Sequence, residues 1–289
     1  MPVRNGASLL REALECLCNQ DFQDFEVIIG DNASTDGTED ICAEFVAKDS
    51  RFRYLRHPEN IGLLANYVEL REATTAPLFM WRAYDDLSDS NYITELVSLF
   101  DSRPGTKLAV PQVESINMDS GSRTSFPYRL YSGENKGLRI VQQLFSSHAS
   151  WFYGLWDRET LAREQDLTYS VYLHPWAADH LTLFPLILDG VVSGTNTTRF
   201  IQRVTSSSHQ RPDKVSLSQM HIEFVEKCRT DISRRHWSMR ERALLEMLLL
   251  RYCDLRTLNR SWSKRLRALF LRRLSKKFSQ MGVIYNESR

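Results

Sequence analysis

The sequence lacks the cysteine patterns that build disulfide scaffolds or zinc sites. Its cysteines form an odd set, without a CxxC pair and without companion histidines at zinc-ligand spacing; they are Cys16, Cys18, Cys42, Cys228 and Cys253. This pattern excludes a small disulfide-stapled domain and a zinc ribbon. It favours reduced, packed thiols in a cytosolic compartment.

Long hydrophobic runs are also missing. There is no signal peptide, and no uninterrupted apolar run reaches the roughly 20 residues that span a bilayer. We therefore expect a cytoplasmic protein, whose contact with the inner face of the cell membrane, if it has one, is peripheral.

A glycine-rich, basic phosphate loop is absent as well. The first loop after a strand-like run lies in EVIIGDNASTDGTED, residues 26–40, and it is acidic and rich in hydroxyl groups. Loops that bind phosphate directly at a helix N-terminus are usually glycine-rich. The loop therefore indicates a different contact with a ligand.

Charge is balanced overall but unevenly distributed. The formal net charge is +1, yet residues 234–277 hold fourteen lysines or arginines against three acidic residues. The remainder of the chain is correspondingly acidic. The two parts are expected to have different partners.

The pattern of apolar residues predicts an α/β fold. No internal repeat appears, and from residue 26 short apolar runs alternate with helical periodicity, which is typical of βα units around a parallel sheet. We expect a Rossmann-like, mostly parallel central sheet flanked by helices, with a C-terminal helical extension after Pro212. The predicted strands are 27–30, 52–55, 78–82 and 108–113.

Helices are predicted between these strands. One follows Asp36, with Asp36 as N-cap and Glu39 completing a capping box. A weaker helix spans 63–73, and another begins near Asp89. Residues 114–136 are polar and predict a long surface excursion. A further helix is predicted in LTLFPLILDG, interrupted or bent by Pro185.

Acidic residues follow the predicted strands. Asp31 and Asp36 follow the first, Asp85 and Asp86 follow a later one, and Asp179 lies in HPWAADHLTLF. The carboxyl ends of parallel strands share one edge, so the first two groups should converge on one crevice. A divalent metal carrying a diphosphate would compensate such carboxylates. Alternatively, the Asp85–Asp86 pair only caps the helix near Asp89.

Three segments, in this order, resemble the family-2 inverting glycosyltransferases of the GT-A fold, which act in bacterial polysaccharide and glycan biosynthesis. They are MPVRNGASLLREALECLCNQDFQDFEVIIGDNASTDGTED, RHPENIGLLANY and FMWRAYDDL. The resemblance implies a catalytic domain at 1–212, with a nucleotide-sugar-binding half at 1–110 and an acceptor half at 111–212. A basic helical extension at 213–289 would follow.

The resemblance also implies site residues on the donor side. Pro2, Val3 and Asn5 would lie against the nucleotide, and Asp31 would accept a hydrogen bond from the base, which suits uracil or guanine. The remaining nucleotide-binding positions are Asn60, Gly62, Asn66 and Asp85. Mg2+ or Mn2+ would bind at Asp85 and Asp86, although Ala83 replaces the first aspartate of the family's DxD motif.

On the acceptor side, the resemblance places the general base at Asp179. Inversion needs a base that deprotonates the acceptor hydroxyl while the nucleoside diphosphate leaves from the opposite face. Ala178 replaces the first acid of the family's usual acidic pair, and the alternative role of Asp179 is an N-cap for a helix beginning at His180. His209 is a candidate metal ligand and Trp176 a candidate platform for the acceptor.

The basic segment 260–278 is expected to lie on an anionic membrane. It holds eight basic residues and no acid, and its apolar residues fall on one helical stripe. A helix packed on the catalytic domain is the alternative. Nucleic acid is not an expected partner, because no recognition motif accompanies the charge.

The function expected from these features is inverting transfer of a sugar, with a UDP-sugar as the expected donor, to a glycan or lipid-linked glycan. Two alternatives stay open. One is a non-catalytic nucleotide-binding or scaffold protein of the same fold. The other is a sugar nucleotidylyltransferase, which should carry the basic glycine-rich loop that this chain lacks.

Overall fold

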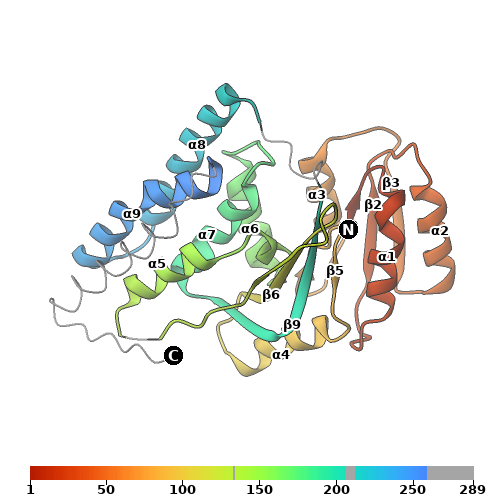
Figure 1. The fold of residues 1–289 in the computed structure, drawn as a ribbon, viewed down its shortest axis with the longest axis horizontal. Helices are drawn as coiled ribbons and strands as arrows, with labels where there is room; N and C mark the ends of the chain where they lie inside the picture. The colour runs from red at the N-terminus through yellow and green to blue at the C-terminus, as the bar shows by residue number, and fades with distance from the viewer. Residues whose placement is uncertain (133, 206–211, 259–289) are drawn as a thin grey trace.

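The computed structural model describes residues 1–132, 134–205 and 212–258. Three parts lie side by side in Figure 1: a small parallel sheet with its helices on the right, a second sheet in the middle, and the last two helices on the left. None of the helices in these ranges is both long and apolar enough to cross a membrane.

The small sheet is parallel, with strand order β1-β2-β3. Its elements are β1 (Pro2–Val3), α1 (Ala7–Cys18), β2 (Val27–Asp31), α2 (Thr38–Lys48) and β3 (Phe52–Arg56). Side chains of β2 alternate between two apolar clusters, because Val27 and Ile29 face α1 and α2 while Ile28 faces the other way. Helix α3 (Leu63–Glu72) packs so closely that a Cβ at Gly30 would lie 2.6 Å from Leu70.

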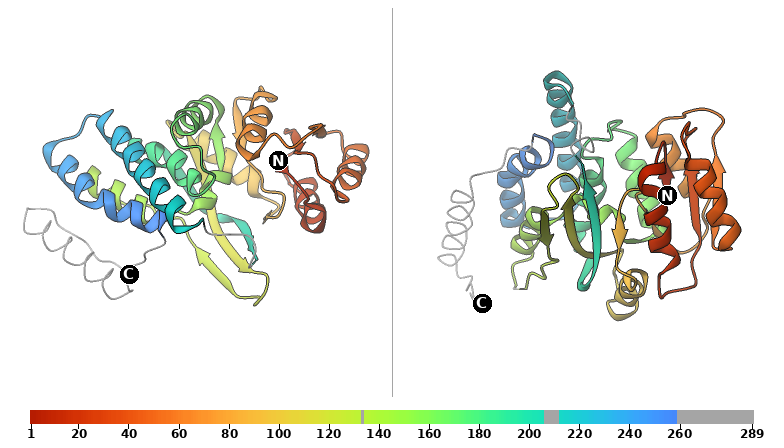
Figure 2. Two further views of the ribbon diagram at one scale, coloured as in Figure 1. Left: turned by 90° about the horizontal axis from the view of Figure 1, so that it is seen from above. Right: turned by 45° about the vertical axis from the view of Figure 1, so that its right-hand side comes forward.

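The second sheet is mixed, with order β4-β8-β6-β9-β5 and β7 paired to β6. Its strands are β4 (Leu78–Met80), β5 (Leu87–Ser88), β6 (Leu108–Asn117), β7 (Arg123–Phe126), β8 (Leu155–Asp157) and β9 (Val192–Val204). Parallel pairing here is confined to β6 with β9; the other pairs are antiparallel. The β6–β7 hairpin projects from the body in the left view of Figure 2.

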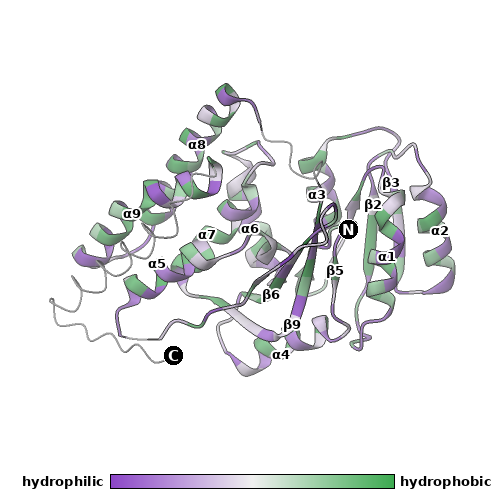
Figure 3. Cartoon of the chain, viewed as in Figure 1, coloured by the Kyte–Doolittle hydropathy of each residue, from purple (hydrophilic) through white to green (hydrophobic). Residues whose placement is uncertain are grey.

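Helices cover this second sheet and extend beyond it. They are α4 (Tyr92–Ser102), α5 (Lys136–Ser146), the 3-10 helix η1 (Ala149–Tyr153), α6 (Arg158–Tyr169), α7 (Ala178–Asp189), α8 (Lys214–Ser233) and α9 (Met239–Thr257). Most helices alternate hydrophobic and hydrophilic residues along their length (Figure 3), as expected of helices with one buried face. Helix α7 is an exception, because all its residues from His180 to Leu188 are buried.

The expected α/β class is confirmed, as are the C-terminal helices, and all four predicted strands and the helix at 63–73 occur within a few residues of their expected bounds. Helix α4 begins at Tyr92 with Asn91 as its N-cap, so the alternative that the Asp85–Asp86 pair caps this helix is wrong.

Three local predictions were wrong wholly or in part. The segment 114–136 lies largely at the surface as expected, but it contains the end of β6 and all of β7, which stabilise each other by hairpin pairing. Helix α7 runs through Pro185 without interruption. The N-cap of α2 is Gly37, so Asp36 lies one residue before it and Glu39 pairs with Arg56 rather than closing a capping box.

Candidate functional site

The hydroxyl-rich loop after β2 binds the start of α1. Its side chains accept hydrogen bonds from three consecutive backbone N–H groups: Asn5 N to Ser34 Oγ (2.9 Å), Gly6 N to Thr38 Oγ1 (3.0 Å) and Ala7 N to Asp36 Oδ2 (3.0 Å). The first N–H groups of a helix have no partner within the helix, so this loop satisfies donors that would otherwise be unpaired. The loop is therefore a structural clasp between β1–α1 and β2–α2.

Asn5 takes part in the same clasp. Its Oδ1 accepts a hydrogen bond from Thr35 N at 2.9 Å, and its backbone adopts a left-handed φ of 52°. Pro2 and Val3 precede it as the buried β1 strand, paired with Gly30 and Asp31. The predicted nucleotide residues of β1 thus lie directly beside Asp31, at the carboxyl edge of the parallel sheet.

Asp31 is completely buried and already hydrogen-bonded. Its Oδ2 accepts from the Tyr54 hydroxyl (2.6 Å), its Oδ1 accepts from Ser34 N (2.8 Å), and Arg56 Nε lies 3.7 Å from Oδ2. Burial and this carboxylate together raise the pKa of Tyr54, which keeps the hydroxyl a donor. Any bond to a base would be an additional one, at a carboxylate that the protein holds in place.

The predicted segment 60–66 divides into an exposed and a buried part. Asn60 and Gly62 are exposed, and Gly62 begins α3 with φ 88°, a conformation that favours glycine. Asn66 is buried and donates to Gly30 O at 3.0 Å, so it anchors α3 to the end of β2. Asn32 holds the turn itself, donating to Gly62 O and accepting from Ile61 N.

The Asp85–Asp86 pair contains one accessible and one buried carboxylate. Asp86 is 4% exposed and its Oδ1 accepts from Arg203 N at 2.7 Å, whereas Asp85 is half-buried. Burial, and secondarily the charge of Asp85, raises the pKa of Asp86 to about 7. Asp85 is therefore the better placed of the two to meet a ligand.

Arg203 of β9 fixes the position of this pair. Its side chain is 3% exposed; it donates to the backbone oxygens of Asp85 and Leu9 and forms an ion pair with Glu12 of α1. It thereby joins the second sheet, the aspartate pair and the parallel sheet's first helix. Its guanidinium is therefore occupied by partners within the protein.

Gly6 explains how the aspartate segment approaches the nucleotide edge. A Cβ at Gly6 would lie 2.6 Å from Val3 and 2.7 Å from the Tyr84 ring, distances that side chains do not tolerate. Glycine here allows Tyr84, next to Asp85, to pack against the β1–α1 loop. The segment that carries Asp85 therefore lies against the loop that follows β1.

Asp179 lies in the first turn of α7, one residue after that helix begins at Ala178. It is half-buried, and its Oδ1 accepts from His180 N at 2.7 Å. The alternative of an N-cap was wrong in its position, because the N-cap is Ala177, with a left-handed φ of 61°.

Two buried tyrosines, Tyr67 of α3 and Tyr153 at the end of η1, have raised pKa values. Burial is the main cause, and the charges of Asp85 and Asp179 both add to the rise at each tyrosine. Both hydroxyl groups therefore stay protonated near neutral pH.

The residues around Asp85 suit a metal ion that is coordinated mainly by a bound diphosphate and only partly by the protein. Among the described ranges there is no group of three His, Cys, Asp or Glu side chains that could hold a metal ion. Mg2+ and Mn2+ are commonly bound through one or two carboxylates, with phosphate oxygens and water completing the shell. Asp85 fits this arrangement, and the buried Asp86 fits it less well.

Other predicted residues have separate positions. Trp176 packs against the main apolar cluster and donates from Nε1 to Thr257 O at 3.0 Å. His209 and the basic segment 260–278 lie outside the described residues. Trp151 and Trp156, as expected, are buried core residues.

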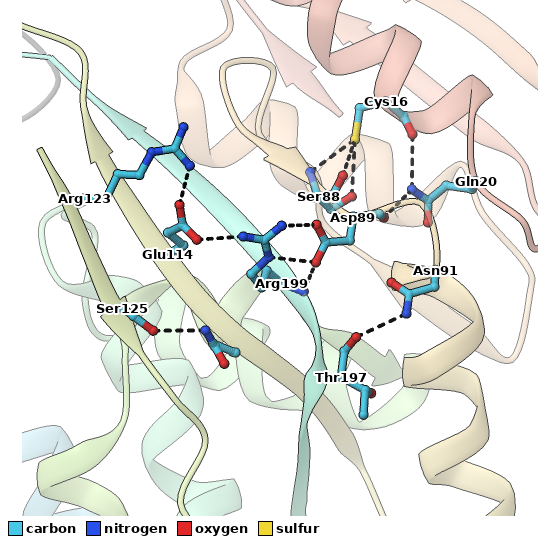
Figure 4. Close-up of polar contacts among 11 residues, drawn as sticks. Cys16, Gln20, Ser88, Asp89, Asn91, Glu114, Arg123, Ser125, Thr197 and Arg199 are labelled. Atoms are coloured by element: carbon cyan, nitrogen blue, oxygen red, sulfur yellow. Dashed lines mark hydrogen bonds and ion pairs between the residues drawn. The ribbon is translucent and has the colours of Figure 1, made fainter. Parts of the chain in front are cut away.

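The guanidinium of Arg199 is occupied by two acidic side chains of the protein. Figure 4 shows its guanidinium between Asp89, which it contacts at 2.8 Å, and Glu114 at 2.9 Å. On the far side of Asp89, Gln20, which follows α1, donates to the Asp89 backbone oxygen at 2.9 Å, and Ser88 N donates to Cys16 Sγ of α1 at 3.1 Å. These polar contacts join α1 to β5, β6 and β9, so they stabilise the packing of the two sheets within the chain.

Sequence reasoning missed Tyr54 and Tyr67, and it did not find the structural partners of Arg203. Tyr54 and Arg203 sit on strands, where alternation indicates which face a side chain occupies but not its partner. Tyr67 directly follows Asn66 in the family-like segment NIGLLANY, which was its only signal.

Solved structures share this fold. S. aureus TarS in complex with UDP matches with a TM-score of 0.64 at 15% identity, covering 88% of this chain and 69% of that one. The mannosyltransferase PcManGT from Pyrobaculum calidifontis, in complex with GDP-Man and Mn2+, matches with a TM-score of 0.53 at 15% identity, covering 96% and 79%. The architecture is the GT-A fold, as the resemblance implied.

Sequence relatives narrow this class. E. coli chondroitin synthase is 34% identical over 200 residues, which is 53% of this chain and 29% of that protein. Glycosyltransferase GlyG of Streptococcus pneumoniae is 39% identical over 62 residues, 22% of this chain and 20% of GlyG. The chain thus matches less than a third of either relative. The family model "Glycosyl transferase family 2" matches residues 1–156, and the chain belongs to that family.

Proposed function

We propose that this chain transfers a sugar from a nucleotide diphosphate sugar to a hydroxyl of a glycan or lipid-linked glycan, with inversion. The observation that carries the proposal is the half-buried Asp85, in the segment that packs against the β1–α1 loop at the carboxyl edge of the parallel sheet. Asp85 would serve the leaving diphosphate, and Asp179 in the first turn of α7 would serve the incoming hydroxyl. Membership of a glycosyltransferase family supports this division of roles.

Asp179 would act as the general base. Its place in the first turn of α7 puts an ordered carboxylate near the positive end of the helix dipole, which favours the ionised form that accepts a proton. The acceptor hydroxyl would pass its proton to Asp179 as its oxygen attacks the anomeric carbon. The nucleoside diphosphate would leave from the opposite face, which inverts the configuration.

The donor would lie along the carboxyl edge of β1–β3. Asp31 would accept a hydrogen bond from the base, with Pro2, Val3 and Asn5 on one side and Asn60, Gly62 and Asn66 on the other. A UDP-sugar is the first donor to test, because uracil offers a ring N–H to Asp31. Fold neighbours in complex with UDP, UDP-GlcNAc and GDP-Man support a nucleotide-sugar donor in general.

Asp85 would bind Mg2+ or Mn2+ together with the diphosphate, and Asp86 would be a second, less accessible ligand of the metal. The metal would supply charge stabilisation for the leaving diphosphate. Arg203 would keep Asp85 in place through its backbone oxygen. The neighbour bound to GDP-Man and Mn2+ supports testing Mn2+ first.

Calorimetry tests the donor site directly. Titrating UDP and GDP into the protein with and without Mn2+ should show binding that Mn2+ strengthens, and Asp85→Ala should remove the Mn2+-dependent part. Asp101→Ala changes an exposed aspartate at the end of α4 and serves as the control. If a nucleotide binds, a donor screen that follows release of nucleoside diphosphate would identify the sugar. If neither nucleotide binds, a non-catalytic scaffold becomes the better description.

The membrane contact is a separate part of the proposal. Segment 260–278 would bind an anionic surface and bring a lipid-linked acceptor to the enzyme, each basic residue near the surface contributing about 1 kcal/mol. Vesicle co-sedimentation tests this: binding to phosphatidylserine vesicles but not to phosphatidylcholine vesicles is expected. Equal binding to both would contradict the electrostatic part.

A further inference from the structure

The loop between α6 and α7 is fastened to the C-terminal helices just before Asp179. Trp176 donates from its indole Nε1 to Thr257 O at 3.0 Å, and the Tyr172 hydroxyl donates to Trp176 O at 2.6 Å. His174 Nε2 lies 3.0 Å from Glu223 of α8. Hydrogen bonds therefore hold both the side chain and the backbone of Trp176.

Thr257 is the junction of these contacts. It is the last residue of α9 and is completely buried. Its Oγ1 donates to Cys253 O at 2.8 Å and lies 2.7 Å from His221 Nδ1 of α8. One turn of helix thus connects α8, α9 and the loop that leads into α7.

The connection from Trp176 to Asp179 is short and constrained. Ala177 has a left-handed φ of 61°, a conformation that residues with a side chain rarely adopt unless their surroundings impose it. Ala178 follows, 5% exposed, and then Asp179. A shift of Trp176 would therefore be passed on to the Asp179 carboxylate.

We propose that Trp176 is a positioning residue for Asp179, and that the last turn of α9 is part of the acceptor site. This inference rests on the proposed function, in which Asp179 is the base. It assigns Trp176 a role different from the predicted stacking on the acceptor. It also makes the C-terminal helices a functional part of the catalytic unit.

The test compares two tryptophans that make the same bond. Trp176→Phe removes the N–H that reaches Thr257 and keeps an aromatic ring. The matched control is Trp237→Phe, because Trp237 is also half-buried and donates from Nε1 to a helix carbonyl, that of Ile232, at 2.8 Å. Both changes are made in the full chain, and transfer, UDP binding and thermal unfolding are measured for each.

The proposal expects a specific pattern. Trp176→Phe should lower kcat about ten- to hundredfold, because small displacements of a reacting group have effects of this size. The acceptor KM and UDP affinity should stay close to wild type, and the lower pH limit of kcat should shift as the surroundings of Asp179 change. Trp237→Phe should lower the unfolding midpoint by a similar amount and leave kcat unchanged.

Other patterns would overturn the inference. A raised acceptor KM with an unchanged kcat would support stacking instead, and equal kcat values for the two variants would show that the Trp176 bond is only structural. Asp179→Asn separates these outcomes from failure of the proposed function. If Asp179→Asn keeps full transfer, the base assignment fails; if it is inactive while Trp176→Phe behaves like Trp237→Phe, only the positioning role fails.

Discussion

The parallel sheet and the mixed sheet reach their cores by different routes. The apolar cluster of the parallel sheet draws all its buried members from residues 1–52, in the order in which strands and helices follow one another. The larger cluster draws its members from residues 28–253, including α8 and α9. Local pattern therefore organises the first region, and contacts between distant segments organise the second.

The same contrast runs through the site. On the donor side, Asp31 and Asp36 bind neighbours on adjacent strands and loops of the parallel sheet. On the acceptor side, Asp179 follows a loop that is bound to α8 and α9, and the donor-side Asp85 is held by Arg203 from the distant strand β9. Four changes test this comparison, beginning with the largest expected effect.

Asp179→Asn should leave the donor side intact and abolish most transfer. Loss of a general base typically costs a factor of 10² to 10⁴, so kcat should fall by about a thousandfold while UDP affinity stays within about twofold. Steady-state kinetics and calorimetry on the same preparation measure both. Full transferase activity in this variant would refute the base assignment.

Arg203→Met should weaken the link between the two regions. The change leaves the backbone oxygens of Asp85 and Leu9 without this donor, which should lower the free energy of unfolding by about 3 kcal/mol. Because supporting residues of metal ligands affect affinity, Mn2+-dependent UDP binding should weaken about tenfold.

Arg199→Met is the control for this experiment. Arg199 also lies on β9, but its side chain is 41% exposed and pairs with Asp89 and Glu114. Exposed ion pairs contribute at most about 1 kcal/mol, so the loss of stability should be small and Mn2+-dependent binding unchanged. Similar effects of the two changes on Mn2+ dependence would argue against the role of Arg203.

Tyr54→Phe should separate stability from nucleotide binding within the parallel sheet. It removes the hydroxyl that donates to Asp31, a bond to a charged group that should be worth about 2 kcal/mol in denaturant unfolding. UDP affinity should change little, whereas Asp31→Asn should lower it about tenfold if Asp31 accepts a bond from the base. Unchanged UDP affinity in Asp31→Asn would exclude that contact.

Asp36→Ala should have the smallest effect, confined to the loop clasp. Losing the bonds from Ala7 and Thr38 should cost about 1 kcal/mol, as for other helix-terminus side chains. Burial opposes ionisation of Asp36, but these hydrogen bonds outweigh it and lower its pKa. Because its pKa is lower in the folded than in the unfolded state, the Asp36 carboxylate stabilises the fold at pH values above its unfolded pKa of about 3.9. This stabilisation is lost as the pH falls below that value.

The difference in unfolding free energy between wild type and Asp36→Ala should therefore be constant near neutral pH and shrink below about pH 4. Denaturant unfolding across this range measures it, with Asp24→Ala, an exposed aspartate on the loop before β2, as control. A difference that persists unchanged into strong acid would contradict the role of the carboxylate.

Much of the parallel sheet could be predicted from the sequence. The strand at 27–30 and the helix at 63–73 follow from apolar periodicity and flanking turn residues, which act over short distances. The role of Asp36 was harder to predict, because an aspartate before a helix can cap that helix or reach another. Here it does both in part, accepting from Thr38 and from Ala7 of α1.

The mixed sheet was less predictable. The hairpin of β6 and β7 was expected as surface excursion, because its polar residues 123–126 are exposed and only pairing with β6 makes them a strand. Strand β9 and Arg203 show the same limit. A basic residue near a predicted diphosphate site suggests a ligand, and nothing in its neighbours along the chain reveals that Glu12, Leu9 and Asp85 surround it.

The sequence by itself determined the class of the protein, several of its strands and helices, and the residue types at the carboxyl ends of those strands. These depend on periodicity and on motifs whose members lie close together in the chain. Only the tertiary structure decided which carboxylates are accessible: Asp86 is buried, whereas Asp85 and Asp179 are half-buried. The physical reason is that burial, pKa and hydrogen-bond partners depend on distances between segments that only folding brings together.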